Sequence, residues 1–167
     1  MSPKQLKLIR DRLLNFKKMR FVLRKKMRYD DVGDYYGNKI ISYDMKNEVI
    51  NNAVMIHEFV EYALIKSAGL TPALIDKFDT DEEYEYRYPK EYKLYRRYHR
   101  MASWIERQFV ENLGLDWKTH EQIINMTKVK TAVQKVTDEL HKLHPSTRKL
   151  KRNKAIVQSE LQGKNAA

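Results

Sequence analysis

Cysteine is absent from this chain of 167 residues. Its absence excludes disulfide bonds and thiolate ligands, so any metal site must consist of histidine and carboxylate side chains. The apolar runs are far shorter than the roughly 18 residues of a membrane span, and no apolar segment follows the basic N-terminal residues as it would in a secretory signal. We therefore expect a soluble, cytoplasmic protein that does not contact membranes.

Glycine and proline are absent from residues 47 to 67, whose apolar positions recur at helical spacing. At about 100° per residue, one stripe of this helix would hold Ile50, Val54, His57, Glu61, Leu64 and Ala68. His57 and Glu61 of the segment H-E-x-x-E therefore face inward, and Glu58 lies at the edge of the stripe. Because ionisable groups are costly to bury without partners, His57 and Glu61 should share a metal ion or hydrogen-bond to each other.

A second long helix is expected from about Pro89 to Asn112. Around His99, its apolar face would hold Tyr92, Tyr95, Ala102, Glu106, Val110 and Leu113. His99 and Glu106 thus share one stripe, about 10.5 Å apart along the axis. Trp104 falls on the opposite side and should need a packing partner of its own.

Residues 35, 36 and 39 to 43 have strand composition around a Gly-Asn turn, which predicts a β-hairpin or a pair of short strands. Asp44 would precede or cap the first long helix, Gly69 would end it, and Thr71 with Pro72 would begin a short helix. We expect the acidic segment 79 to 86 to be an exposed loop. The fold class is therefore mainly α with a small β-hairpin (α+β), with antiparallel helices that carry a metal site between the two long helices.

The chain is expected to form one globular domain made of three segments. Residues 1–28 are a basic helix or arm that packs on the domain through Leu6, Ile9, Leu13 and Phe16. Residues 29–123 form the core that contains H-E-x-x-E. Residues 124–167 form a C-terminal helix and a basic tail.

The formal charge of +11 is unevenly distributed. Residues 1 to 30 carry 11 Lys/Arg against 2 Asp/Glu, residues 31 to 90 carry 6 against 12, and residues 121 to 167 carry 10 against 4. Basic ends favour contact with nucleic acid or an acidic partner, although solubility alone is an alternative explanation. The candidate contact residues are Arg24, Lys25, Lys26, Arg28, Arg148, Lys149, Lys151 and Arg152.

Two helices that each direct a histidine and a glutamate inward favour a bound divalent metal over a metal-free His/Glu network. Ligands without sulfur are typical of a catalytic zinc site, here His57, Glu61 and His99 with water in the fourth position. Glu58 would take the proton of that water, and Glu106 would orient His99 or supply a fourth ligand. Manganese or iron is an alternative to zinc for such a ligand set.

Several short segments occur in an order that resembles one protein family. They are Val32 to Asp34, Ile40 to Tyr43, His57 to Glu61, Ile75 to Asp79, Tyr98-His99 with Glu106, and Leu113 to Trp117. This order resembles small phage-encoded H-E-x-x-E proteins, which are described as uncharacterised or as metal-dependent hydrolases. The resemblance spans roughly residues 29 to 123, implies a phage or prophage origin and hence the host cytoplasm, and supports pairing His57 and Glu61 with His99.

Two functions follow from these patterns. The first is a zinc-type hydrolase acting on an unknown substrate; H-E-x-x-E also resembles the zincin H-E-x-x-H helix, with Glu61 at the second histidine, which suggests a peptidase-like reaction. The second is a basic, nucleic-acid-binding phage accessory protein in which the His/Glu cluster is structural. Sequence alone leaves both open.

Overall fold

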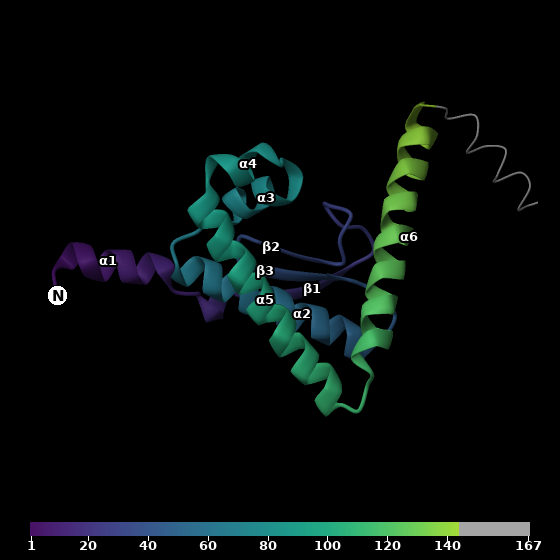
Figure 1. The fold of residues 1–167 in the computed structure, drawn as a ribbon, viewed down its shortest axis with the longest axis horizontal. Coiled ribbons are helices and arrows are strands. Elements are labelled where there is room, and N and C mark those ends of the chain that lie inside the picture. Colours follow the sequence, from purple (N-terminus) through teal and green to yellow (C-terminus); the bar gives the residue numbers. More distant parts are fainter. Residues whose placement is uncertain (144–167) are drawn as a thin grey trace, which may run out of the picture. The chain divides into compact units, whose positions relative to one another are not determined.

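The computed structural model describes residues 1–143, with side chains to Glu139 (Figure 1). Its elements are α1 (Pro3–Arg12), the 3-10 turn η1 (Phe16–Lys18), β1 (Arg20–Arg24), β2 (Gly33–Tyr36), β3 (Lys39–Tyr43), α2 (Glu48–Ser67), α3 (Pro72–Thr80), α4 (Glu83–Arg87), α5 (Pro89–Asn112) and α6 (Trp117–Leu143). The described residues divide into two units, residues 1–128 and residues 129–143. The fold is mainly helical with one small sheet, so the expected α+β class is confirmed.

The sheet has three strands in the order β1-β3-β2. β2 and β3 are antiparallel around the turn at Gly37, whose φ is +61°, so the expected hairpin is confirmed. β1 pairs parallel with β3, from Arg20 opposite Lys39 to Arg24 opposite Tyr43. A parallel pair requires a long connection, and here the loop after β1 together with β2 provides it.

Helix α2 packs against β2, β3 and α5, which makes it the centre of the first unit (Figure 1). Its N-cap is Asn47, whose side chain accepts from the backbone N–H groups of Val49 and Ile50, so Asp44 precedes the helix and does not cap it. Gly69, with φ of +83°, follows the last turn as expected. The apolar core beside α2 consists of Tyr35, Ile40, Tyr62, Ile65, Ile75, Phe78 and Tyr95.

The segment between α2 and α5 is more helical than expected. Thr71 caps α3 and Pro72 opens it, as the sequence predicts. However, α3 continues to Thr80 and α4 follows at Glu83–Arg87, so the expected loop over residues 79 to 86 is wrong. The short helices bring Phe78 against Tyr92 and Tyr95 of α5, with ring centroids 5.3 and 6.0 Å away.

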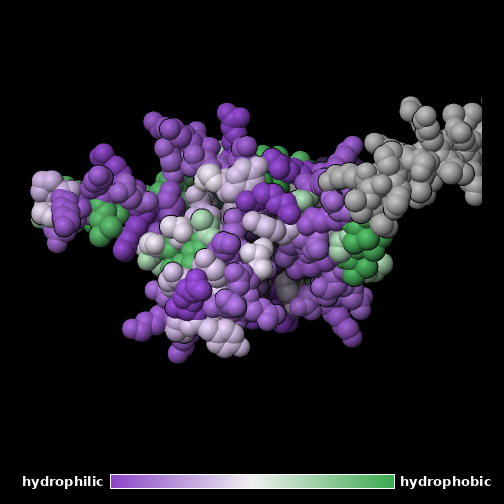
Figure 2. Space-filling view, turned by 90° about the horizontal axis from the view of Figure 1, so that it is seen from above, coloured by the Kyte–Doolittle hydropathy of each residue, from purple (hydrophilic) through white to green (hydrophobic). Residues whose placement is uncertain are grey.

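Two expectations about packing fail. Helix α1 has no buried residue, and Leu6, Ile9 and Leu13 are 51%, 46% and 61% exposed, so this helix does not pack on the core through its apolar stripe. Figure 2 shows apolar atoms of α1 among hydrophilic ones at the left of the view. Trp104 is 63% exposed and has not found the packing partner that was expected for it. Within residues 1–143, no helix is long and apolar enough to cross a membrane.

Candidate metal centre

Three side chains from α2 and α5 meet at one point. His57 Nε2 lies 3.3 Å from His99 Nδ1 and 3.7 Å from Glu61 Oε2, and His99 Nδ1 lies 2.6 Å from Glu61 Oε2. His57 and Glu61 are one turn apart on α2, whereas His99 comes from the middle of α5. These are the three residues that the sequence proposed as metal ligands, and together they could hold a metal ion.

The spacing of the three atoms fits a tetrahedral ion. With bonds of about 2.0–2.1 Å, neighbouring ligand atoms in a tetrahedral zinc site lie roughly 3.3 Å apart. The two distances from His57 Nε2, 3.3 and 3.7 Å, are close to this value. The distance of 2.6 Å between His99 and Glu61 is that of a charge-assisted hydrogen bond, so bound metal would replace one proton there.

Glu106 fixes the orientation of His57. Its Oε2 lies 2.9 Å from His57 Nδ1, and its Oε1 lies 2.8 Å from His120 Nε2. Burial alone would raise the pKa of Glu106, but the hydrogen bonds from His120 and His57 lower it, so the carboxylate is ionised and both histidines donate. The bond to Glu106 holds Nδ1 of His57 on one side of the ring. Nε2, on the other side, faces His99 and Glu61. The histidine oriented by Glu106 is therefore His57, and the expected role beside His99 is corrected.

Glu61 has a second partner, Tyr35 of β2. The Tyr35 hydroxyl donates to Glu61 Oε1 over 2.8 Å, which leaves Oε2 for the histidines. Both side chains are buried, with exposed fractions of 6% and 4%. Burial raises the pKa of Tyr35, and the Glu61 charge adds to that effect, so Tyr35 remains a donor.

Opposite charges stabilise the cluster when no metal is bound. Burial lowers the pKa of His57, but hydrogen bonds to Glu106 and Glu61 outweigh it and raise the pKa to about 10. Burial raises the pKa of Glu61, but the hydrogen bonds of His57 and His99 outweigh it and lower the pKa to about 2. A proton on His57 thus takes the role of a cation between the two carboxylates.

Glu58 lies beside this group and does not belong to it. The carboxyl group has no hydrogen bond among the described residues, and it packs against Gly33 at the start of β2. Burial raises the pKa of Glu58 well above its usual range, and the charge of Glu61 raises it further, although His57 opposes both. A carboxyl group with a raised pKa and no fixed partner is suited to proton transfer.

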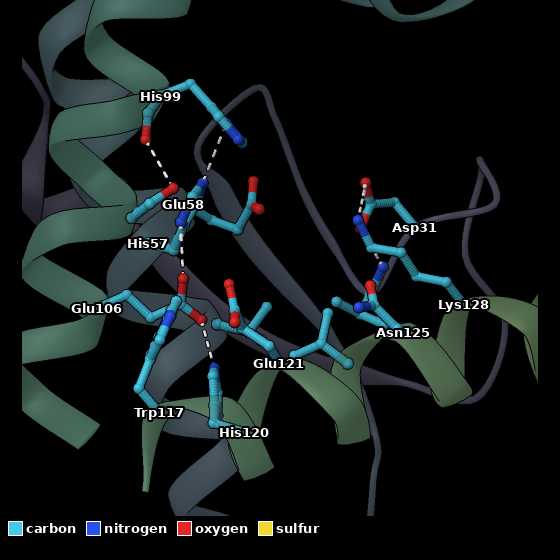
Figure 3. Close-up of a pocket in the computed structure, with 14 residues that line it drawn as sticks. Asp31, His57, Glu58, His99, Glu106, Trp117, His120, Glu121, Asn125 and Lys128 are labelled. Carbon is cyan, nitrogen blue, oxygen red and sulfur yellow. Dashed lines mark hydrogen bonds and ion pairs between the residues drawn. The ribbon is translucent and has the colours of Figure 1, made fainter. Parts of the chain in front are cut away.

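A cavity of about 260 Å³ opens next to the three candidate ligands (Figure 3). Its wall contains His57, Glu58 and His99, and it extends to Glu121 and Lys128 on α6. Glu61 is not part of the wall. A substrate in the cavity would therefore reach one face of the histidine pair, with Glu58 on the same side.

His120 is the residue of this site that sequence reasoning missed. It is 2% exposed, donates to Glu106, and stacks on Trp117 with ring centroids 5.1 Å apart. Among the described residues, its Nδ1 is the one buried side-chain nitrogen or oxygen without a hydrogen-bond partner. The signal was present, since Trp117, His120, Ile124 and Thr127 share one helical stripe and His120 lies near its centre. Tyr35 was missed as a partner of Glu61, because a strand residue carries no such periodic signal.

The candidate nucleic-acid contacts differ in whether they are paired or exposed. Arg28 donates to both carboxylate oxygens of Asp34 over 2.7 Å, and Arg24 donates to the Tyr36 hydroxyl over 2.7 Å. Lys25 and Lys26 are exposed. The remaining candidates, Arg148, Lys149, Lys151 and Arg152, lie outside the described residues.

Comparison with protein-family models, curated proteins and solved structures found no match to this chain.

Proposed function

We propose that this protein is a metal-dependent hydrolase in which His57, Glu61 and His99 bind a divalent ion. The observation that carries the proposal is the convergence of His57 Nε2, His99 Nδ1 and Glu61 Oε2 beside a cavity. Two nitrogens and one carboxylate oxygen are a ligand set of catalytic zinc, with manganese or iron as alternatives. The bound ion would act as a Lewis acid that activates water.

The residues of the chain then have separate roles. Glu106 and Tyr35 hold His57 and Glu61 in place through the hydrogen bonds described above. Glu58 accepts a proton from a water molecule in the cavity while the water oxygen bonds to the substrate. The bond to the leaving group then breaks, and Glu58 returns the proton to that group. Burial raises the pKa of Glu58, which makes the carboxylate a stronger base once it has lost its proton.

Metal titration of protein stripped with a chelator tests the proposal. We expect one zinc ion per chain by calorimetry, with binding lost in His99→Ala. His99 is the ligand of choice because its side chain is 40% exposed, so its removal leaves the core intact. The matched control is Arg100→Ala, the exposed neighbour on α5, which should bind zinc as the wild type does.

A second variant separates binding from reaction. Glu58→Gln should retain zinc and lose hydrolysis of peptide or ester substrates by about 10²-fold or more. Folded protein that binds no zinc, manganese or iron at millimolar concentration would rule out the hydrolase. The resemblance to phage H-E-x-x-E proteins agrees with this function, and a phage or prophage origin is part of the same proposal.

A further inference from the structure

The cavity beside the candidate metal centre is acidic, although the chain as a whole is basic. Its wall holds four carboxylates, Asp31, Glu58, Glu106 and Glu121, and one lysine, Lys128. Lys128 Nζ lies 3.0 Å from Asp31 Oδ1, so these two charges offset each other. Glu106 is bonded to His57 and His120, and burial disfavours the charged form of Glu58. Glu121 is therefore the carboxylate that gives the wall its negative charge, which repels phosphate and carboxylate groups.

Glu121 and Trp117 form one side of the cavity (Figure 3). They are one turn apart on α6, so both side chains extend from the same face of the helix. Glu121 has no hydrogen bond or ion pair within the described part of the chain. A carboxylate beside an aromatic ring is a combination that binds cations, through charge and through the face of the ring.

The Nδ1 atom of His120, which has no hydrogen-bond partner among the described residues, is a second observation that points to a ligand. His120 lines the cavity, is 2% exposed, and donates from Nε2 to Glu106. Its Nδ1 has no hydrogen-bond partner among the described residues, and this atom is an acceptor in a histidine that donates from Nε2 alone. Since a buried acceptor without a donor is costly, a ligand that carries N–H groups would relieve this cost.

We propose that the cavity binds a positively charged group with N–H donors, and that the substrate is a peptide with lysine or arginine next to the hydrolysed bond. The hydrolytic part rests on the proposed function, whereas binding of the cation needs no metal. The acidic wall, Trp117 and the acceptor on His120 all suit an ammonium or guanidinium group. The candidate polyanion contacts Arg24, Lys25, Lys26 and Arg28 are not part of this cavity wall.

Fluorescence of Trp117 provides the test. The chain has two tryptophans, so Trp104→Phe, at an exposed position outside the cavity, leaves Trp117 as the single reporter. This protein, stripped of metal, is titrated with blocked tripeptides Ala-X-Ala in which X is lysine, arginine, norleucine or glutamate. We expect saturable changes with lysine and arginine, binding at least tenfold weaker with norleucine, and none with glutamate.

Two carboxamide variants locate the binding. Glu121→Gln should weaken binding of the lysine peptide roughly fivefold, as expected for loss of one solvent-accessible charge pair. Glu111→Gln on α5, outside the cavity, should leave binding unchanged. Equal binding of norleucine and lysine peptides, tighter binding of the glutamate peptide, or no response to any peptide would overturn the inference. Peptide binding without zinc binding would overturn the hydrolase alone.

Discussion

Gly33 and Glu58 occupy adjoining space so closely that a β-carbon on Gly33 would lie 2.1 Å from Oε1 of Glu58. The next nearest atoms are Cδ and Cγ of the same side chain, at 2.5 and 2.8 Å. The glycine in β2 is therefore what allows the Glu58 carboxyl group to lie where it does. Strand β2 thus limits where the candidate general base on α2 can lie.

Gly33→Ala should displace Glu58 and leave the fold intact, because only the end of one flexible side chain must move. We expect a stability change within about 1 kcal/mol, unchanged zinc affinity, and a loss of hydrolytic rate of about 10²-fold from misplacement of the carboxyl group. The control is Gly37→Ala, which is strained at a φ of +61° but meets no atom within 4 Å. That variant should be less stable and fully active; equal activity of both variants would contradict the role of Glu58.

Glu106→Gln should weaken metal binding about 10-fold to 100-fold without removal of a ligand. The amide has one oxygen, so it can accept from His57 or from His120 but not from both. Calorimetry with zinc measures the effect, and Glu111→Gln on the same helix, where Glu111 accepts from Arg107 over 2.8 Å, is the control. Unchanged affinity in Glu106→Gln would mean that His57 needs no orienting partner.

Tyr35→Phe removes the hydroxyl that donates to Glu61 over 2.8 Å. Because the acceptor is a buried charge, we expect a loss of about 1.5–3 kcal/mol in urea unfolding, together with weaker zinc binding. Tyr62→Phe, which removes a donor to the Gly37 carbonyl, should cost about 1 kcal/mol and leave zinc binding unchanged. A zinc affinity lowered equally in both variants would point to a general loss of packing instead.

Stability of the metal-free protein should depend on pH through His57 and Glu61. The pKa of His57 is raised from 6.5 to about 10, so its contribution is complete below pH 6.5 and is lost as pH rises through 10. The pKa of Glu61 is lowered from 4.5 to about 2, so its contribution is complete above pH 4.5 and is lost as pH falls through 2. The two contributions are therefore complete together between about pH 4.5 and 6.5.

Without metal, stability falls as pH rises toward the pKa of His57. Bound zinc should instead stabilise the protein more as pH rises, because metal binding requires unprotonated His57. Thermal unfolding between pH 5 and 9, with chelator and with zinc, measures both curves. At 100 times its dissociation constant zinc should add about 2.7 kcal/mol, or roughly 10 °C in Tm. His57→Gln should remove the decline between pH 7 and 9 in the chelated protein; an identical decline in that variant would contradict the assignment to His57.

Nucleic-acid binding by the basic ends remains a separate proposal with its own test. Fluorescence anisotropy with a labelled oligonucleotide should show binding that weakens steeply with salt. Binding should survive His99→Ala and fail when Lys25 and Lys26 are replaced by alanine together with Arg148, Lys149, Lys151 and Arg152. The absence of binding at low salt would exclude this function.

The sequence predicted those parts of the molecule that depend on local periodicity. The inward positions of His57, Glu61 and His99 followed from helical spacing, and all three meet in the structure. The parallel pairing of β1 with β3 did not follow, because strand partners are chosen by long-range packing and not by local composition. Helix α1 was predicted from its local pattern, but its packing was not. An amphipathic pattern shows which face is apolar and does not show whether another element covers that face.

The hydrogen-bond partners within the site could not be predicted from residue spacing alone. Glu106 was found on the correct stripe, yet its choice of His57 over His99 depends on how α2 and α5 cross. Prediction of His120 would have needed the helical periodicity of α6, where scattered threonines obscure the apolar pattern.

The hydrogen bonds of Glu106 and Glu61 join groups that are far apart in the chain, from Tyr35 in the sheet to His120 at the start of α6. No contiguous fragment shorter than residues 35 to 120 contains the whole network. The complete candidate metal site therefore does not exist until strands and helices have assembled, so we expect that bound metal would not nucleate folding. It should instead slow unfolding of the first unit as a whole, and protect slowly exchanging amide protons of β2, α2 and α5 to a similar extent.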